Sequence, residues 1–182
     1  MKQYWLVCII CWSIQIAHAQ IIFNKGTTTI YFVRHAEKEK GTNPILTEAG
    51  KQRAGDLFRL LRNEPIKRIY VTQYQRTALT ADSLRILGHI DTTHYWADTT
   101  GISLKQQITE HKDWGKTLLV IGHSNTIPAV IKAMGYTAEP IEIADNAFDQ
   151  VFILTIKKRR ITLKRRLYGL PPTATAEKMV LQ

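Results

Sequence analysis

The chain has 182 residues, of which 45% are hydrophobic and 22% are charged, so a collagen-like or disordered protein is excluded. This length suits one domain with a full hydrophobic core. The formal net charge of +10 favours anionic ligands and surfaces in general.

The first predicted element is a secretory signal peptide over residues 1–19. Lys2 provides a positive start, residues 5–16 are an apolar run, and Ala17-His18-Ala19 is a small-x-small cleavage site. The run is too short for an ordinary membrane span; a buried first helix and an uncleaved anchor are the alternatives. We therefore expect an exported protein, periplasmic or secreted, with no stable membrane insertion after cleavage.

Both cysteines, Cys8 and Cys11, lie inside this segment. Its removal leaves no thiol, which excludes a disulfide framework, a CxxC redox site and a cysteine nucleophile. Loss of Lys2 leaves 24 basic and 15 acidic side chains, a net charge of +9.

Strands and helices then alternate. A β-branched and aromatic run at residues 28–33 predicts a buried strand. Thr47 predicts the N-cap of an amphipathic helix, whose apolar residues recur at 54, 57, 58 and 61. A second strand is expected at residues 66–71, followed by a helix over 76–87 that Gly88 ends.

The second half of the chain begins with the same alternation. Residues 93–96 predict a short strand, and Ser103 a cap for a third helix. The continuous apolar run at 117–121 is typical of a central parallel strand. A helix over about 126–134 follows it.

The last third of the chain predicts an antiparallel hairpin at residues 151–156 and 161–168, then a loose polar tail at 171–182. The expected fold is therefore α/β: a three-layer sandwich with a mainly parallel central sheet flanked by helices, and a C-terminal antiparallel hairpin. We expect one domain over residues 20–182, with its core at about 28–169.

Seven of the positive charges fall within ten residues, at 157–160 and 164–166. A solvated face of the hairpin is the simpler interpretation. Nucleic-acid binding is the alternative, but the chain has no zinc-finger spacing and no RNP-like aromatic motif. No nucleic-acid partner is expected.

In parallel sheets, ligands bind beyond the carboxyl ends of the strands. Arg34 and His35 follow the first strand, Arg76 follows the second, and His123 ends the apolar strand. Two cations and two imidazoles at one crevice make an anion site. The alternative to an anion site is that these histidines are structural and the arginines lie at the surface without a ligand.

This set of residue types suits phosphoryl transfer. A neutral imidazole attacks phosphorus, while arginine forks stabilise the non-bridging oxygens, and a carboxylic acid or water protonates the leaving oxygen. No step requires a metal or another cofactor, and no His/Asp/Glu cluster has metal-ligand spacing.

Four segments together resemble the histidine phosphatase superfamily, in its phosphoglycerate-mutase-like and small phosphohistidine-phosphatase-like branch. They are residues 31–38 (YFVRHAEK), 46–50 (LTEAG), 75–81 (QRTALTA) and 120–126 (VIGHSNT). The resemblance implies that His35 is the nucleophile, that Arg34, Arg76 and His123 hold the phosphoryl group, and that the fold is the family's α/β sandwich.

The chain departs from the family at three places. Gln73 replaces a common Pro, Ser124 replaces a Gly, and no Glu occupies the general-acid position of the mutase branch. Asp98 is the first substitute as proton donor, with a loop or capping role as the alternative. Glu110 is the second, and Glu37 either donates a proton or orients the nucleophile.

The predicted function is an exported, metal-independent phosphatase that hydrolyses phosphomonoesters or phosphoramidates of small molecules through a phosphohistidine on His35. A phosphate-binding module of the same fold without turnover is the alternative. A phosphoglycerate mutase is less favoured, because its substrates are cytosolic. The sequence carries no signal for an oligomeric state.

Overall fold

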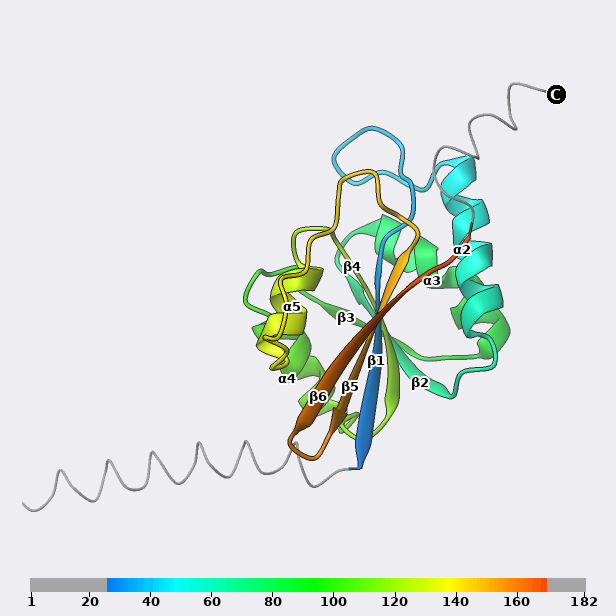
Figure 1. Ribbon diagram of the computed structural model, residues 1–182. Helices are drawn as coiled ribbons and strands as arrows, with labels where there is room; N and C mark the ends of the chain where they lie inside the picture. Colours follow the sequence, from blue (N-terminus) through cyan, green and yellow to red (C-terminus); the bar gives the residue numbers. More distant parts are fainter. Residues whose placement is uncertain (1–25, 170–182) are drawn as a thin grey trace, which may run out of the picture.

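The computed structural model describes residues 26–169, which form one sheet between two pairs of helices (Figure 1). In chain order the elements are β1 (Thr27–Arg34), α2 (Glu48–Leu61), β2 (Ile66–Thr72), α3 (Gln75–Gly88), β3 (Thr92–Tyr95), α4 (Ile102–Glu110), β4 (Thr117–Gly122), α5 (Ile127–Ala133), β5 (Gln150–Lys157) and β6 (Arg160–Leu167). This order confirms the three-layer α/β sandwich and the C-terminal hairpin.

The strands follow the order β3-β2-β4-β1-β5-β6. The four strands β3, β2, β4 and β1 pair in parallel, while β5 pairs antiparallel with both β1 and β6. The sheet is therefore mixed, since the predicted hairpin extends the parallel part rather than standing apart from it. As a consequence β1, which ends at Arg34, has neighbours on both sides.

Alternating residues of each central strand belong to two apolar clusters, one on each face of the sheet. Ile30 and Phe32 of β1 pack with α4 and α5, whereas Tyr31 and Val33 face α2 and α3. Ile30, Phe32 and Val33 are fully buried, and burial of such a side chain stabilises the fold by roughly 1.5–3 kcal/mol. Because both faces of β1 are covered, its carboxyl end is held rigidly.

The predicted helix boundaries are confirmed at α2 and α5 and corrected at α3 and α4. Thr47 caps α2 by accepting a hydrogen bond from the backbone N–H of Gly50. At the end of α3, Gly88 is still helical, and His89 takes the left-handed conformation at φ 49°. Ser103 lies inside α4, whose N-cap is Gly101; the Ser103 hydroxyl accepts from the N–H of Trp96 instead.

The signal peptide with its two cysteines, and the polar tail, lie outside the described residues and stay predictions. Within residues 26–169, no helix is long and apolar enough to cross a membrane.

Candidate active site

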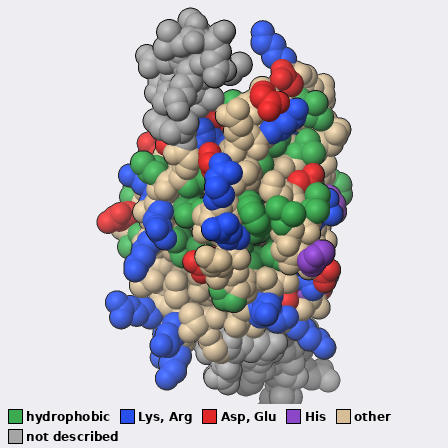
Figure 2. Space-filling view, turned by 90° about the vertical axis from the view of Figure 1, so that its right-hand side faces the viewer, with side chains coloured by type: hydrophobic (Ala, Val, Ile, Leu, Met, Phe, Trp, Pro, Cys, Tyr) green, Lys and Arg blue, Asp and Glu red, His purple; other side chains and the backbone are tan. Residues whose placement is uncertain are grey.

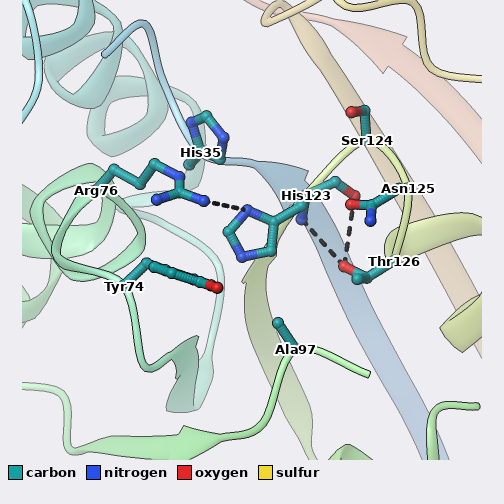
Figure 3. A pocket seen from close by; sticks show the side chains of 8 residues that line it. All are labelled: His35, Tyr74, Arg76, Ala97, His123, Ser124, Asn125 and Thr126. Carbon is teal, nitrogen blue, oxygen red and sulfur yellow. Dashed lines mark hydrogen bonds between the residues drawn. The ribbon is translucent and has the colours of Figure 1, made fainter. Parts of the chain in front are cut away.

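The carboxyl ends of β1, β2 and β4 meet at one edge of the sheet. β4 pairs with both other strands, and the N–H of His35 donates to the carbonyl of Gly122 over 2.9 Å. A pocket of about 260 Å³ opens at this edge. Eight residues line it: His35, Tyr74, Arg76, Ala97, His123, Ser124, Asn125 and Thr126 (Figure 3). Three of the five expected site residues, His35, Arg76 and His123, thus share one pocket, whereas Arg34 and Asp98 do not line it.

His35 is 4% exposed, and one of its two ring nitrogens forms a hydrogen bond. Its Nδ1 lies 2.8 Å from the carbonyl oxygen of Ala36. A carbonyl only accepts hydrogen bonds, so Nδ1 carries the proton and Nε2 keeps its lone pair. Burial, together with the charges of Arg76 and Arg34, lowers the pKa of His35 to about 4. At neutral pH the ring is an unprotonated imidazole with a free nitrogen, as a nucleophile requires.

His123 is also neutral, and its tautomer is the opposite one. Its Nδ1 faces a guanidinium nitrogen of Arg76 at 3.4 Å, and its Nε2 lies 3.0 Å from the hydroxyl of Thr72. A guanidinium only donates, so Nδ1 accepts and Nε2–H donates to Thr72. Burial, then the neighbouring His35 and Arg76, lowers the pKa of His123 to about 3. The two histidine rings lie edge to face, 5.2 Å apart.

Arg76 enters the pocket from the first turn of α3, with its guanidinium 4.2 Å from the centre of the Tyr74 ring. Burial lowers the pKa of Arg76. The Nε atoms of Arg76 and Arg34 are buried and have no hydrogen-bond partner within residues 26–169. Buried polar groups are nearly always hydrogen-bonded, so these two N–H donors are suited to an oxyanion ligand.

Arg34 does not line the pocket; the connection between α5 and β5 holds it. Its Nη1 donates to the carbonyl of Ala144 at 2.8 Å, and its guanidinium lies 4.1 Å from the centre of the Phe148 ring. Burial lowers the pKa of Arg34, and the carboxylate of Asp145 opposes that shift. The Phe148 ring also lies 6.2 Å from the His35 ring. Phe148 and Asp145 are site residues that the sequence did not reveal.

Asp98 serves as a helix cap. Its carboxylate accepts hydrogen bonds from the backbone N–H groups of Thr100, Gly101 and Ser103, at 2.5 to 3.1 Å. Burial raises the pKa of Asp98, but these donors and the Thr100 hydroxyl outweigh it, so the net shift is downward. A proton donor needs a raised pKa. The capping alternative is therefore favoured, and Asp98 as proton donor is disfavoured.

The other two candidate carboxylates are also engaged away from the pocket. Glu37 forms a forked ion pair with the buried Arg53 at 2.6 to 2.8 Å. Glu110 ends α4, at the opposite edge of the sheet, and accepts from Gln106 and Gln107. None of the eight lining residues is acidic. The carboxylate of Asp145 approaches from outside, 3.5 Å from the Ser124 hydroxyl.

Several motif residues outside the pocket shape the backbone around His35. A Cβ at Gly50 would lie 2.1 Å from the carbonyl oxygen of Glu37, so only glycine lets α2 pack there. Thr80 accepts the N–H of Ala36 at 2.9 Å. Gln73, which replaces the family's Pro, accepts the N–H of the pocket residue Ala97 at 3.1 Å. Gly50 of the motif at residues 46–50 and Thr80 of the motif at 75–81 therefore support the backbone next to His35.

Within residues 26–169, no group of three or more His, Cys, Asp or Glu side chains is arranged to hold a metal ion.

Comparison with known proteins points to one family. Residues 30–95 match the model of the histidine phosphatase superfamily, branch 1. A comparison with curated proteins found none that matches this sequence.

Solved structures share the fold. A candidate phosphohistidine phosphatase SixA from Nakamurella multipartitia is 19% identical, with a TM-score of 0.58, over 80% of this chain and 97% of that one. Its counterpart from Agrobacterium tumefaciens is 22% identical, with a TM-score of 0.56, over 78% and 97%. An alpha-ribazole phosphatase from Shigella flexneri is 12% identical, with a TM-score of 0.58, over 79% and 96%. At these identities, the likeness establishes the fold alone. The match over residues 30–95 confirms the resemblance noted in the motifs: this part of the chain is similar to the histidine phosphatase superfamily, and the described domain has the same fold as these structures.

Proposed function

We propose that this protein is an exported, metal-independent phosphatase that hydrolyses phosphomonoesters or phosphoramidates through a phosphohistidine on His35. The family match supports a histidine-nucleophile phosphatase acting on a small phosphorylated substrate. Export rests on the predicted signal peptide, and metal independence on the arginine donors.

One observation carries the chemistry: His35 is neutral, and its proton is held on Nδ1 by the carbonyl of Ala36. The lone pair of Nε2 attacks phosphorus, and the bond from phosphorus to the leaving atom breaks with its electron pair. Arg76, which lines the pocket, stabilises the charge on the non-bridging oxygens. The resemblance to the family assigns Arg34 as the second donor, through its buried Nε–H, which has no hydrogen-bond partner within residues 26–169. Water then attacks the phosphohistidine, releases phosphate and returns the imidazole.

The same pocket defines which leaving groups react well. No acidic residue lines it, so the departing atom takes its proton from water or leaves as an anion. Substrates with leaving groups of low pKa, or phosphoramidates whose nitrogen is protonated before departure, are therefore favoured. Alkyl phosphates, whose leaving alkoxide is strongly basic, should turn over slowly.

The test is release of p-nitrophenol from p-nitrophenyl phosphate in EDTA by the purified protein. His35→Ala should abolish turnover, whereas the exposed His94→Ala should leave it unchanged. Normal turnover by His35→Ala would contradict the proposal. Cell fractionation tests export, which requires the activity outside the cytoplasm and a protein that starts at Gln20.

A binding module without turnover is the second candidate, favoured by the lack of a lining carboxylate. It predicts tight binding of phosphate or vanadate with negligible hydrolysis of every substrate, including aryl phosphates. Ready turnover of any phosphoester would exclude it. Interconversion of 2- and 3-phosphoglycerate would instead support a mutase.

A further inference from the structure

The hairpin of β5 and β6 carries a dense positive charge, which is most concentrated at its turn; farther along β6, Arg165 lines a cavity together with Glu139 and Glu142. No Asp or Glu occurs between residues 150 and 167. Seven cationic side chains are exposed, and among the ion pairs within residues 26–169 none involves them. They are Lys157, Lys158, Arg159, Arg160, Lys164, Arg165 and Arg166, called the basic hairpin below. A face that merely keeps a protein soluble usually mixes both signs of charge.

The turn of the basic hairpin lies at the edge of the sheet opposite to the pocket. Lys157 pairs with Thr27, the first residue of β1, while His35 follows the last residue of that strand. Figure 1 shows this turn beside the start of β1, at the lower end of the sheet. At about 3.3 Å per residue, the eight residues of β1 separate the turn from the pocket by roughly 25 Å.

The surface around this edge is rich in cations. Figure 2 shows several Lys and Arg side chains projecting at the lower left of the molecule, with no acidic side chain among them. The apolar run at residues 5–16 precedes β1 by only ten residues in the sequence. The sheet begins at Thr27, and the turn of the hairpin lies beside this residue.

The composition of the hairpin favours a lipid surface over a nucleic acid. Residues 157–167 contain no aromatic side chain, and single-stranded nucleic acids bind mainly by base stacking on aromatic rings along a basic groove. An array of flexible cations without such rings is suited to a diffuse anionic surface, where each Lys or Arg strengthens binding about fivefold.

We propose that the turn of the basic hairpin, residues 157–160, holds this protein against an anionic lipid surface, with the phosphatase pocket facing away from the bilayer. The contact is electrostatic and peripheral, and it needs no insertion. It is independent of the reaction in the pocket, so its failure leaves the proposed activity untouched.

The experiment is cosedimentation of the chain from Gln20, which keeps the whole sheet and both apolar clusters, with phosphatidylglycerol-containing vesicles and with phosphatidylcholine vesicles. The test variant neutralises the turn: Lys157→Gln, Lys158→Asn, Arg159→Gln and Arg160→Gln. Asn suits position 158, where φ is 52°. The control removes four exposed cations elsewhere: Lys40→Gln, Lys51→Gln, Arg59→Gln and Arg85→Gln.

We expect tight binding to anionic vesicles only, weakening steeply with salt. The turn variant should bind at least about 100-fold more weakly, since four contributions of about fivefold are lost, while the control changes by less than about threefold. Vesicle-bound wild-type protein should still hydrolyse p-nitrophenyl phosphate. An equal loss in both variants, binding that ignores lipid charge, loss of activity on the vesicle, or tighter binding to single-stranded RNA at equal salt would each overturn the proposal.

Discussion

The two buried histidines make the fold sensitive to mild acid. In the unfolded chain a histidine titrates near 6.5, whereas burial and the arginines lower the pKa of His35 to about 4 and of His123 to about 3. Between pH 6.5 and these lowered pKa values, the histidines of the unfolded chain bind protons that the folded protein does not bind. The free energy of unfolding therefore falls as the pH falls. The stabilisation is complete above pH 6.5 and is lost progressively toward pH 4.

The size of this loss follows from the shifts. One pKa unit corresponds to about 1.4 kcal/mol, so protonation of His35 alone opposes folding by up to roughly 3 kcal/mol near pH 4. The charge of His35 contributes to the lowered pKa of His123, so the two effects are not additive. We expect a total of about 3 to 5 kcal/mol, a large part of the stability of a domain of this size.

The measurement is urea denaturation at a series of pH values between 7 and 4. The wild type should lose stability across this window, and the double variant His35→Gln/His123→Gln should lose much less. The exposed His94→Gln is the matched control and should follow the wild type. Parallel curves for the wild type and the double variant would refute the reasoning.

Three further changes test the neighbours of the pocket. Phe148→Leu removes the ring beside Arg34 and should raise KM for p-nitrophenyl phosphate about 3- to 10-fold with little change in kcat, while Phe148→Tyr restores it; an unchanged KM would contradict the positioning role. Thr72→Val removes the acceptor of His123 Nε2–H and should lower kcat about 10-fold, whereas Thr72→Ser should retain it; full activity in the Val variant would rule that role out. Asp98→Asn should lower stability by about 1 kcal/mol as a weakened cap, with kcat within threefold; a large fall in kcat at unchanged stability would reinstate Asp98 as proton donor.

Much of the fold could be predicted because the local signals agree with it. The apolar run of β4 and the amphipathic pattern of α2 are strong periodic signals, and both elements lie where expected. Strand ends in a parallel sheet share one edge, which is why His35 and His123 could be placed together before the geometry was known.

Most of the rest depends on contacts that no local pattern encodes. Arg34 was expected in the pocket, yet its contacts come from residues 110 or more positions later, brought there by the pairing of β5 with β1. The engagement of Asp98 depends on the left-handed turn at Gly101. The antiparallel partner of β1 leaves no signal in the residues around Arg34, whereas Gly101, three residues after Asp98, is a local signal for the turn and agrees with the capping alternative.

The most direct test of the mechanism is to trap the phosphoryl group on the enzyme. The protein is mixed with substrate carrying a radioactive phosphoryl group, quenched in alkali, where phosphohistidine persists, and digested for peptide mapping. The label should lie on the peptide that contains His35, should disappear with acid, and should be absent in His35→Ala. Turnover without any label on His35, or label and turnover that persist in His35→Ala, would contradict the assignment of His35 as the nucleophile.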